Sequence, residues 1–150
     1  MSFAYGNAPE SSFAYNNYGF ILCGVVGDIE TGYQFGQLAL ELTNQLGEKQ
    51  IRVMNMLPYN ALVRPWKEHV RKTLPTFLVN YQIGLEVGNL EYVAYYAFYY
   101  SYASYSVGEE LVNLEQEIEQ SYNRSFETRR YPLLAEHIVA NCLKFNRTFQ

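Results

Sequence analysis

The feature that most constrains this chain is a tyrosine-rich stretch at residues 90–107, LEYVAYYAFYYSYASYSV. It holds seven tyrosines and one phenylalanine, and it carries no charge after Glu91. Small or apolar residues recur in it at helical spacing: Leu90, Ala94, Ala97, Ser101 and Ser104. Because each buried aromatic ring removes about 150 to 250 Å² from water, the pattern predicts a buried helix at the energetic centre. Its small face predicts close approach of a neighbouring helix at Ala97, with Tyr96 on the opposite side.

Other structures for this stretch fit its length and spacing less well. A membrane-spanning helix needs about 20 mostly apolar residues, and this run is shorter and rich in hydroxyl groups. A strand is typically about 5–6 residues long, and its small residues would recur with period 2 rather than 3.6. Aromatic residues at helical spacing are far more often core than ligand site, so we interpret the stretch as core.

Length, composition and charge restrict the class of protein. The 150 residues suffice for one domain, and 49% hydrophobic with 17% aromatic residues excludes a disordered chain. The net charge is −4, and the basic residues are scattered apart from residues 64–72 and Arg129-Arg130, which argues against a nucleic-acid partner. Cys23 and Cys142 stand alone, and no charged region precedes an apolar leader. We therefore expect a cytoplasmic protein without a membrane span.

The first half of the chain predicts two helices and a turn between them. Pro9-Glu10 favours a helix start, and the apolar face of the first helix is expected at Ala14, Tyr18, Ile21, Leu22 and Val25. Gly24 and Gly27 end that helix, and the Asp28 carboxylate is expected to cap the next one. The second helix has its apolar face at Phe35, Leu38, Ala39, Leu42 and Leu46, and Gly47 is its expected left-handed cap.

The next two predicted helices contain prolines. The third helix covers residues 49–64, and Pro58 is expected to kink or split it. The inward residues of this helix are predicted to be Met54, Leu57, Ala61 and Leu62. The fourth helix begins near Pro65, with Trp66 as its anchor, and continues through a kink at Pro75 to Gly88-Asn89. Its inward residues are predicted to be Val70, Leu74, Phe77, Leu78, Tyr81 and Leu85.

Two further helices are predicted after Gly108, which brings the total to about seven. One spans residues 109–120 with a glutamate-rich face, and its apolar side is Leu111, Leu114, Ile118 and Tyr122. The other begins at Tyr131-Pro132, and its apolar side is Leu134, Ile138, Cys142, Phe145 and Phe149. No segment alternates like a half-buried strand. The sequence therefore predicts an all-α protein.

An internal repeat predicts how these helices are arranged. GVVGDIE at residues 24–30 and GLEVGNLE at residues 84–91 share a glycine, a spacer, a second glycine, an Asx residue, an apolar residue and a glutamate. Such a junction combines a C-terminal cap with an N-terminal cap, as in an antiparallel helix pair. The fold class expected is antiparallel helical hairpins stacked as a TPR-like α-solenoid. The segment from Gly27-Asp28 to Ala39 matches the GDxxxA pattern of a tetratricopeptide repeat, except that Gly32 replaces the usual alanine.

Two long strings of the sequence resemble a known family. They are YGNAPESSFAYNNYGFILCGVVGDIETGYQFGQLAL at residues 5–40 and VRPWKEHVRKTLPTFLVNYQIGLEVGNLEYVAYYAFYYSYASY at residues 63–105. Both look like the helical-repeat region of large bacterial multi-sensor signalling kinases. In that family a serine/threonine kinase domain and an AAA-like ATPase precede this region, and GAF sensor and histidine kinase modules follow it. The resemblance implies that residues 1–150 form one helical-repeat segment of a longer multidomain chain.

No residue of this segment is predicted to be catalytic, cofactor-binding or metal-binding. The chain has no Gly-rich loop with a lysine, no HRD or DFG, no GxxxxGK(S/T) and no histidine phosphoacceptor motif. His69 is interpreted as a capping or salt-linked surface residue, and His137 lacks a second histidine one turn away. Cys23 and Cys142 are expected to be inert core residues. The glutamates between residues 109 and 119 lack a calcium-loop pattern and are interpreted as a solvated face.

The function expected from the resemblance is a non-catalytic scaffold, not an enzyme. It would couple an ATPase module to sensor and kinase output through contacts with neighbouring ATPase, GAF and kinase modules, without a cofactor. The alternative is a free-standing module that binds a peptide or small effector at Tyr99, Tyr102 and Tyr105. Because Phe145 and Phe149 lie on an apolar helix side, self-association through the C-terminal helix is also expected.

Overall fold

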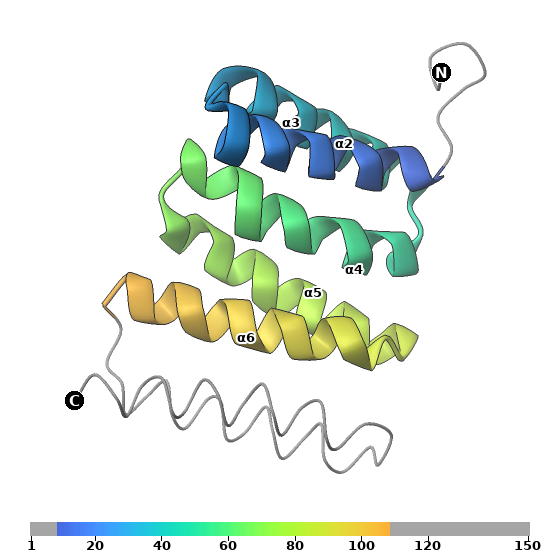
Figure 1. Cartoon of the computed structure of the whole chain (residues 1–150). Coiled ribbons are helices and arrows are strands. Elements are labelled where there is room, and N and C mark those ends of the chain that lie inside the picture. Colours follow the sequence, from blue (N-terminus) through green and yellow to red (C-terminus); the bar gives the residue numbers. More distant parts are fainter. Residues whose placement is uncertain (1–8, 109–150) are drawn as a thin grey trace. The chain divides into compact units, whose positions relative to one another are not determined.

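The computed structural model describes residues 9–108, and in this range the chain is all-α (Figure 1). Helices contain 89% of these residues, and none of these residues lies in a strand, which confirms the all-α part of the predicted fold class. The described chain divides after Thr73 into two compact units, residues 9–73 and residues 74–108. The range contains five helical segments.

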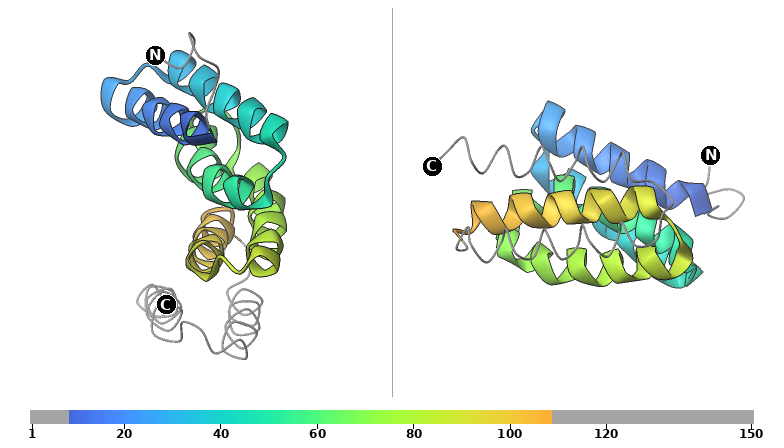
Figure 2. Two further views of the ribbon diagram at one scale, coloured as in Figure 1. Left: turned by 90° about the vertical axis from the view of Figure 1, so that its right-hand side faces the viewer. Right: turned by 90° about the horizontal axis from the view of Figure 1, so that it is seen from below.

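The first unit contains three long helical segments and one short turn. The first is α2 (Pro9–Ile21) continued by the π-helical turn η1 (Leu22–Val26), and the second is α3 (Ile29–Leu46). The third is α4 (Lys49–Pro58), continued by the π-helical η2 (Tyr59–Val63) and the 3-10 turn η3 (Arg64–Trp66). A second 3-10 turn, η4 (Val70–Thr73), ends the unit. Figures 1 and 2 show α2 and α3 side by side and antiparallel, and both contact α4 and η2.

The second unit, as far as it is described, is a single helical hairpin. Its helices are α5 (Leu74–Val87) and α6 (Leu90–Ser106), which pack side by side along their length. The ring of Phe77 on α5 lies 6.2 Å from the ring of Tyr96 on α6, measured between centroids. Phe77 is 2% exposed and Tyr96 is fully buried, so aromatic rings form the centre of this hairpin.

The two junctions that look alike in the sequence also have the same geometry. Gly27 and Gly88 both have positive φ, at 83° and 74°. Asp28 caps α3 with φ −84° and ψ 76°, and Asn89 caps α6 with φ −87° and ψ 72°. Each side chain accepts a hydrogen bond from the backbone N–H three residues later, over 3.1 Å at Asp28 and 3.4 Å at Asn89. The predicted helix-ending glycine followed by an Asx cap is therefore confirmed at both sites.

The predicted face of the first helix is wrong. Ala14, Tyr18, Ile21 and Val25 are exposed, and of the five residues predicted to face inward only Leu22 is buried. The buried side consists of small or polar residues: Ser12, Asn16, Gly19 and Cys23. The physical reason is close backbone approach, because a Cβ on Gly19 would lie 2.7 Å from the carbonyl oxygen of Gly32. Large side chains have no space where Gly19 meets Gly32, and the rings of Tyr15 and Tyr18 instead pack against Phe35 of α3, with centroids 6.0 and 4.8 Å away.

The proline and tryptophan predictions are partly confirmed. The α-helix changes to a π-helix directly after Pro58, as expected from its missing donor. Trp66, however, ends the third segment instead of anchoring a new one, since its indole N–H donates to the carbonyl of Leu62 over 3.0 Å. Pro75 lies in the first turn of α5, where no kink is needed, so the predicted kinked helix is wrong. Two residues predicted to face inward, Met54 and Leu78, are exposed.

The tyrosine-rich helix forms as predicted, but its buried side differs. Ser101 and Ser104 are buried, whereas Ala94 and Ala97 are only partly buried. Tyr96, expected opposite the packed face, is wholly buried in it. The helix therefore packs through a large ring as well as through its small residues.

Several predictions lie outside the described residues. These are the helices after residue 108 and the roles assigned there to the glutamates at 109–119, His137, Cys142, Phe145 and Phe149. Within residues 9–108 no helix combines the length and the apolar character that crossing a membrane requires.

Candidate functional site

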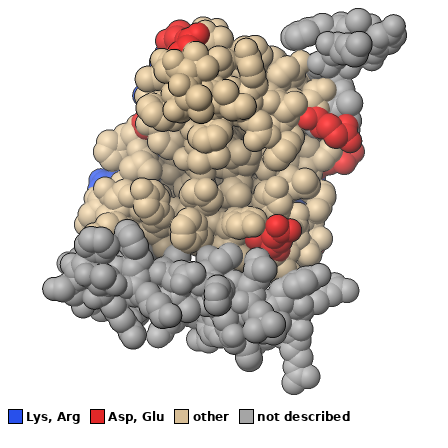
Figure 3. All heavy atoms as spheres, viewed as in Figure 1, with Lys and Arg blue, Asp and Glu red and all other residues tan. Residues whose placement is uncertain are grey.

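The outer face of the first helical segment is the most unusual surface of the first unit. We call it the outer face of α2 and define it by its exposed large apolar side chains: Phe13, Tyr18, Phe20, Ile21, Val25 and Val26. Val25 is 76% exposed and Val26 is 64% exposed. The sequence contains no charged side chain between residues 11 and 27. In Figure 3, viewed as in Figure 1, the surface over α2 is accordingly uncharged along its middle.

The opposite side of the same helix explains why these residues point outward. A Cβ on Gly32 of α3 would lie 2.5 Å from the Cys23 sulfur and 2.7 Å from the Gly19 carbonyl oxygen. Real Cβ atoms do not approach other atoms so closely, so α2 and α3 pack backbone to backbone. Most of the large apolar side chains of this segment therefore lie on the exposed side, whereas Leu22 is buried.

A buried polar cluster joins α2, α3 and α4 below this surface. The amide nitrogen of Asn55 donates to the Ser12 hydroxyl over 2.5 Å and to the Thr43 hydroxyl over 3.3 Å. Asn16 donates in return to the Asn55 carbonyl over 2.9 Å. All four side chains are at most 3% exposed. The sequence did not lead us to this cluster, and the available signal was the helical spacing of the polar residues Ser12 and Asn16.

The outer face of α2 extends onto the end of the third helical segment. Trp66 is 48% exposed, and its ring lies 4.0 Å from where a Cβ on Gly24 would stand. The Phe20 ring lies 3.4 Å from the same point on its other side. Gly24 thus has no side chain of its own and lies beside two exposed aromatic rings. The apolar surface therefore continues from α2 to η3.

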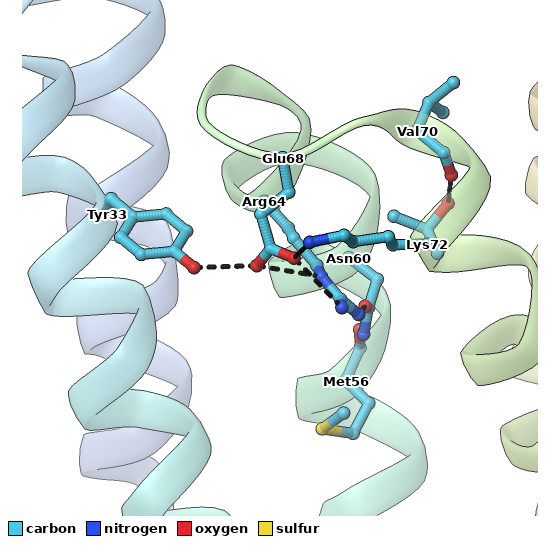
Figure 4. A network of polar contacts seen from close by, with 8 residues as sticks. Tyr33, Met56, Asn60, Arg64, Glu68, Val70 and Lys72 are labelled. Atoms are coloured by element: carbon cyan, nitrogen blue, oxygen red, sulfur yellow. Dashed lines mark hydrogen bonds and ion pairs between the residues drawn. The ribbon is translucent and has the colours of Figure 1, made fainter.

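A second feature, the Glu68 cluster, lies where the third helical segment ends (Figure 4). It consists of Tyr33, Asn60, Arg64, Glu68 and Lys72. The Tyr33 hydroxyl donates to the Glu68 carboxylate over 2.7 Å, and two Arg64 nitrogens lie 3.2 Å from the two carboxylate oxygens. Lys72 lies 3.4 Å from the same carboxylate, and Arg64 also donates to the Asn60 side-chain oxygen over 3.0 Å.

These contacts fix the ionisation of the cluster. The hydrogen bond from Tyr33, followed by that from Arg64, lowers the pKa of Glu68 from 4.5 to about 2. Burial, followed by the hydrogen bond to Glu68, raises the pKa of Tyr33 well above its ordinary value. Glu68 is therefore ionised and Tyr33 neutral across the physiological pH range. Arg64, Lys67 and Lys72 all pair with carboxylates, which offsets part of the positive charge of this basic stretch.

The individual residues considered from the sequence have structural roles. Cys23 is 2% exposed, which confirms a core position, and burial followed by the charge of Asp28 raises the pKa of its thiol. His69 is exposed, and its Nδ1 accepts from the Arg71 backbone N–H over 3.1 Å, which confirms the capping interpretation. Among residues 9–108, no three His, Cys, Asp or Glu side chains are grouped in a way that could hold a metal ion.

The three tyrosines of the alternative binding site occupy different environments on α6. The Tyr99 ring packs against Phe98 at 5.3 Å and faces Phe77 at 6.2 Å, and burial raises the pKa of its hydroxyl. Tyr102 is 56% exposed, while Tyr105 is half-buried. Tyr102 is thus the member best placed to meet a ligand.

The geometry of residues 9–108 describes a packing module with one unusual apolar surface. The string RPWKEHVRKTLP, which lies within the second of the two long strings, forms η3, the following connector, η4 and the first two residues of α5. Comparisons of the chain with protein-family models, with curated proteins and with solved structures found no match.

Proposed function

We propose that this chain is a non-catalytic helical-repeat scaffold of a cytoplasmic multi-sensor signalling kinase. In this proposal its antiparallel hairpins continue as a TPR-like α-solenoid of about seven helices. The segment couples an ATPase module to sensor and kinase output. Support comes from the sequence resemblance, from the equal caps of α3 and α6, and above all from the outer face of α2.

The outer face of α2 carries the proposal because it is suited to one kind of partner. It offers large apolar side chains over an entire helix and no charge of its own between residues 11 and 27. A charged partner would lose its hydration there without gaining a counter-ion. An apolar helix face of a neighbouring ATPase, GAF or kinase module would gain roughly 25 cal/mol for each Å² of apolar surface that it buries. We therefore assign such a helix as the occupant.

The arrangement of the helices suits a relay. Helices in repeat proteins contact mainly their neighbours, so that a displacement at one helix passes to the next through packed side chains. In the first unit α2 contacts α3, and both contact α4 and η2. A partner bound to α2 would thus act on a surface that is continuous with the core of the first unit.

The proposal is tested by photo-crosslinking in the cells that express the native protein. A benzoylphenylalanine replaces Ile21, which lies on the outer face of α2, and in a matched control it replaces Glu41, an exposed residue of α3. We expect adducts at position 21 with peptides of kinase, ATPase or GAF modules, in the same chain or another, and few at position 41. Adducts with lipid, or equal labelling at both positions, would contradict the proposal.

The same experiment tests the alternative, a peptide or effector site on α6. The observation in its favour is the exposure of Tyr102, at 56%, beside Phe98, at 36%. A crosslinker at position 102 that captures a peptide while position 21 captures nothing would favour this alternative over the scaffold.

A nucleotide test addresses the expectation that the segment itself has no ATPase or kinase activity. We expect the thermal unfolding temperature to be unchanged by millimolar Mg-ATP, because a ligand that binds the folded state raises it by mass action. A dose-dependent rise would contradict the assignment of catalysis to other modules.

A further inference from the structure

We propose that the Glu68 cluster is a conformational latch that holds the segment at residues 67–73 against α3. Opening the latch would release this segment while α2 and α3 stay folded. The proposal goes beyond the scaffold function, because it assigns a movable element within the first unit and names the side chain that controls it.

The connector at residues 67–69 differs from the other helix connectors of the described chain. The connectors after α2–η1, α3 and α5 each contain a glycine with positive φ, namely Gly27, Gly47 and Gly88. The connector after η3 has no glycine, and Lys67 has φ −122°. Besides backbone hydrogen bonds, side chains hold its conformation, as His69 does by accepting from the N–H of Arg71. A connector held by side chains is one that side-chain changes can open.

Two side-chain contacts tie this connector to α3. The first is the hydrogen bond from Tyr33 to Glu68, over 2.7 Å. The second is the ion pair of Lys67 with Glu30, and the Lys67 ammonium also lies 5.4 Å from the centre of the Tyr33 ring. The Lys67 and Glu30 side chains are 34% and 65% exposed, so water weakens their pair. The tie through Glu68 is therefore the stronger of the two.

Glu68 joins three elements through one carboxylate. It binds Tyr33 on α3, Arg64 on η3 and Lys72 on η4. The Glu68 and Arg64 side chains are only 19% and 20% exposed, which favours strong charge-assisted hydrogen bonds. Replacing the carboxylate by an amide removes the charge from all three contacts at once, whereas replacing the Tyr33 hydroxyl removes only the contact to α3. This difference makes the latch testable in two steps.

The position of the latch gives it a role in transmission. The latched segment ends at Thr73, which is the last residue of the first unit, and the next residue, Leu74, begins α5. Every covalent path from one unit to the other passes through this segment. When the latch is closed, residues 67–73 are packed as part of the first unit. When it is open, they form a flexible linker.

Hydrogen exchange of the full chain, followed by mass spectrometry, tests the latch. The probes are the amides of Lys67 and Glu68, which donate to the Arg64 carbonyl, and that of Lys72, which donates to the His69 carbonyl. We expect Glu68→Gln to accelerate exchange at residues 67–73 about tenfold, because hydrogen bonds to charged groups exceed neutral ones in strength. Tyr33→Phe should give a smaller increase at the same amides.

The control is Glu41→Gln, a charge change on the exposed side of α3 outside the cluster, which should change nothing. Unchanged exchange at residues 67–73 in both Glu68→Gln and Tyr33→Phe would overturn the proposal. Equal acceleration throughout α2 and α3 in Tyr33→Phe would also overturn it, because the cluster would then hold the whole unit together. Both readouts are independent of crosslinking at position 21, so latch and scaffold can fail separately.

Discussion

Two helix pairs of this protein share the same caps, but the closest contacts at their centres differ. The pair of α2 and α3 meets at its centre through glycine, with Gly19 and Gly32 in backbone contact, while Tyr18 packs on Phe35 beside this contact and most large apolar side chains of α2 are exposed. The pair of α5 and α6 meets through rings, with Phe77 packed against Tyr96 at its centre. A helix that packs through glycine can keep large apolar side chains exposed, whereas a helix that packs through its rings buries them.

The difference shows that an apolar side chain on a helix does not by itself identify the buried face. On α2 the polar residues Ser12 and Asn16 are inside because Asn55 and Thr43 complete hydrogen bonds to this buried cluster. On α5 the apolar residue Phe77 is inside because no backbone contact excludes it. The partner helix therefore decides which face is buried.

The largest expected effect contrasts one phenylalanine from each pair. Phe77→Ala should lower the free energy of unfolding by about 3–5 kcal/mol, as truncating a buried ring does. Phe13→Ala, at 42% exposure, should change it by no more than about 0.5 kcal/mol. Urea titration followed by circular dichroism measures both. A comparable loss in the two variants would show that Phe13 is covered in solution.

The next effect tests the glycine contact directly. Gly32→Ala should lower the free energy of unfolding by about 1–3 kcal/mol, because the new Cβ meets Cys23 and the Gly19 backbone. Gly24→Ala is the matched control, since its Cβ has ordinary contact at 3.4 Å and alanine favours a helix by about 1 kcal/mol. Urea midpoints of the two variants compare them. A stabilised Gly32→Ala would mean that the helices can separate without loss.

We expect acid to destabilise the unit that contains α2 and α3, through protonation of Glu68. Its pKa is lowered on folding, so its carboxylate stabilises the folded state fully above pH 4.5, and this contribution disappears as the pH falls towards about 2. We expect the thermal unfolding temperature to drop over this range in the native protein and to drop less in Glu68→Gln. Scanning calorimetry at pH 5 and pH 2.5 measures it. Equal decreases in the unfolding temperature of the two proteins would show that Glu68 does not contribute to the acid response.

The smallest effect concerns the caps that the two pairs share. Asn89→Ala should cost about 1 kcal/mol, because it removes the hydrogen bond to the N–H of Tyr92. Asn89→Asp should retain the bond, as Asp28 makes the same contact with Thr31. Glu48→Ala is the control, since Glu48 precedes α4 without a capping side-chain bond. If Asn89→Ala is as stable as the native protein in urea, the cap contributes nothing.

The sequence allowed the helices and their ends to be predicted, because these depend on local chemistry. Gly27, Asp28, Gly88 and Asn89 determine backbone angles and hydrogen bonds within a few residues. The buried face of α2 could not be predicted, because it depends on Gly32 at a contact distant along the chain. The Glu68 cluster was missed for the same reason, since Tyr33 and Glu68 are 35 residues apart.

The glycine contact also has a consequence for oxidation of the protein. The Cys23 sulfur lies where a side chain on Gly32 would stand, 2.5 Å from its Cβ position, so no oxygen atom fits on that side of the sulfur. Burial raises the pKa of the thiol and keeps it protonated, whereas peroxides attack the thiolate. Oxidation of Cys23 therefore requires a local opening that exposes the sulfur. The same packing that turns the apolar side chains of α2 outward protects the one cysteine of the described residues from peroxide.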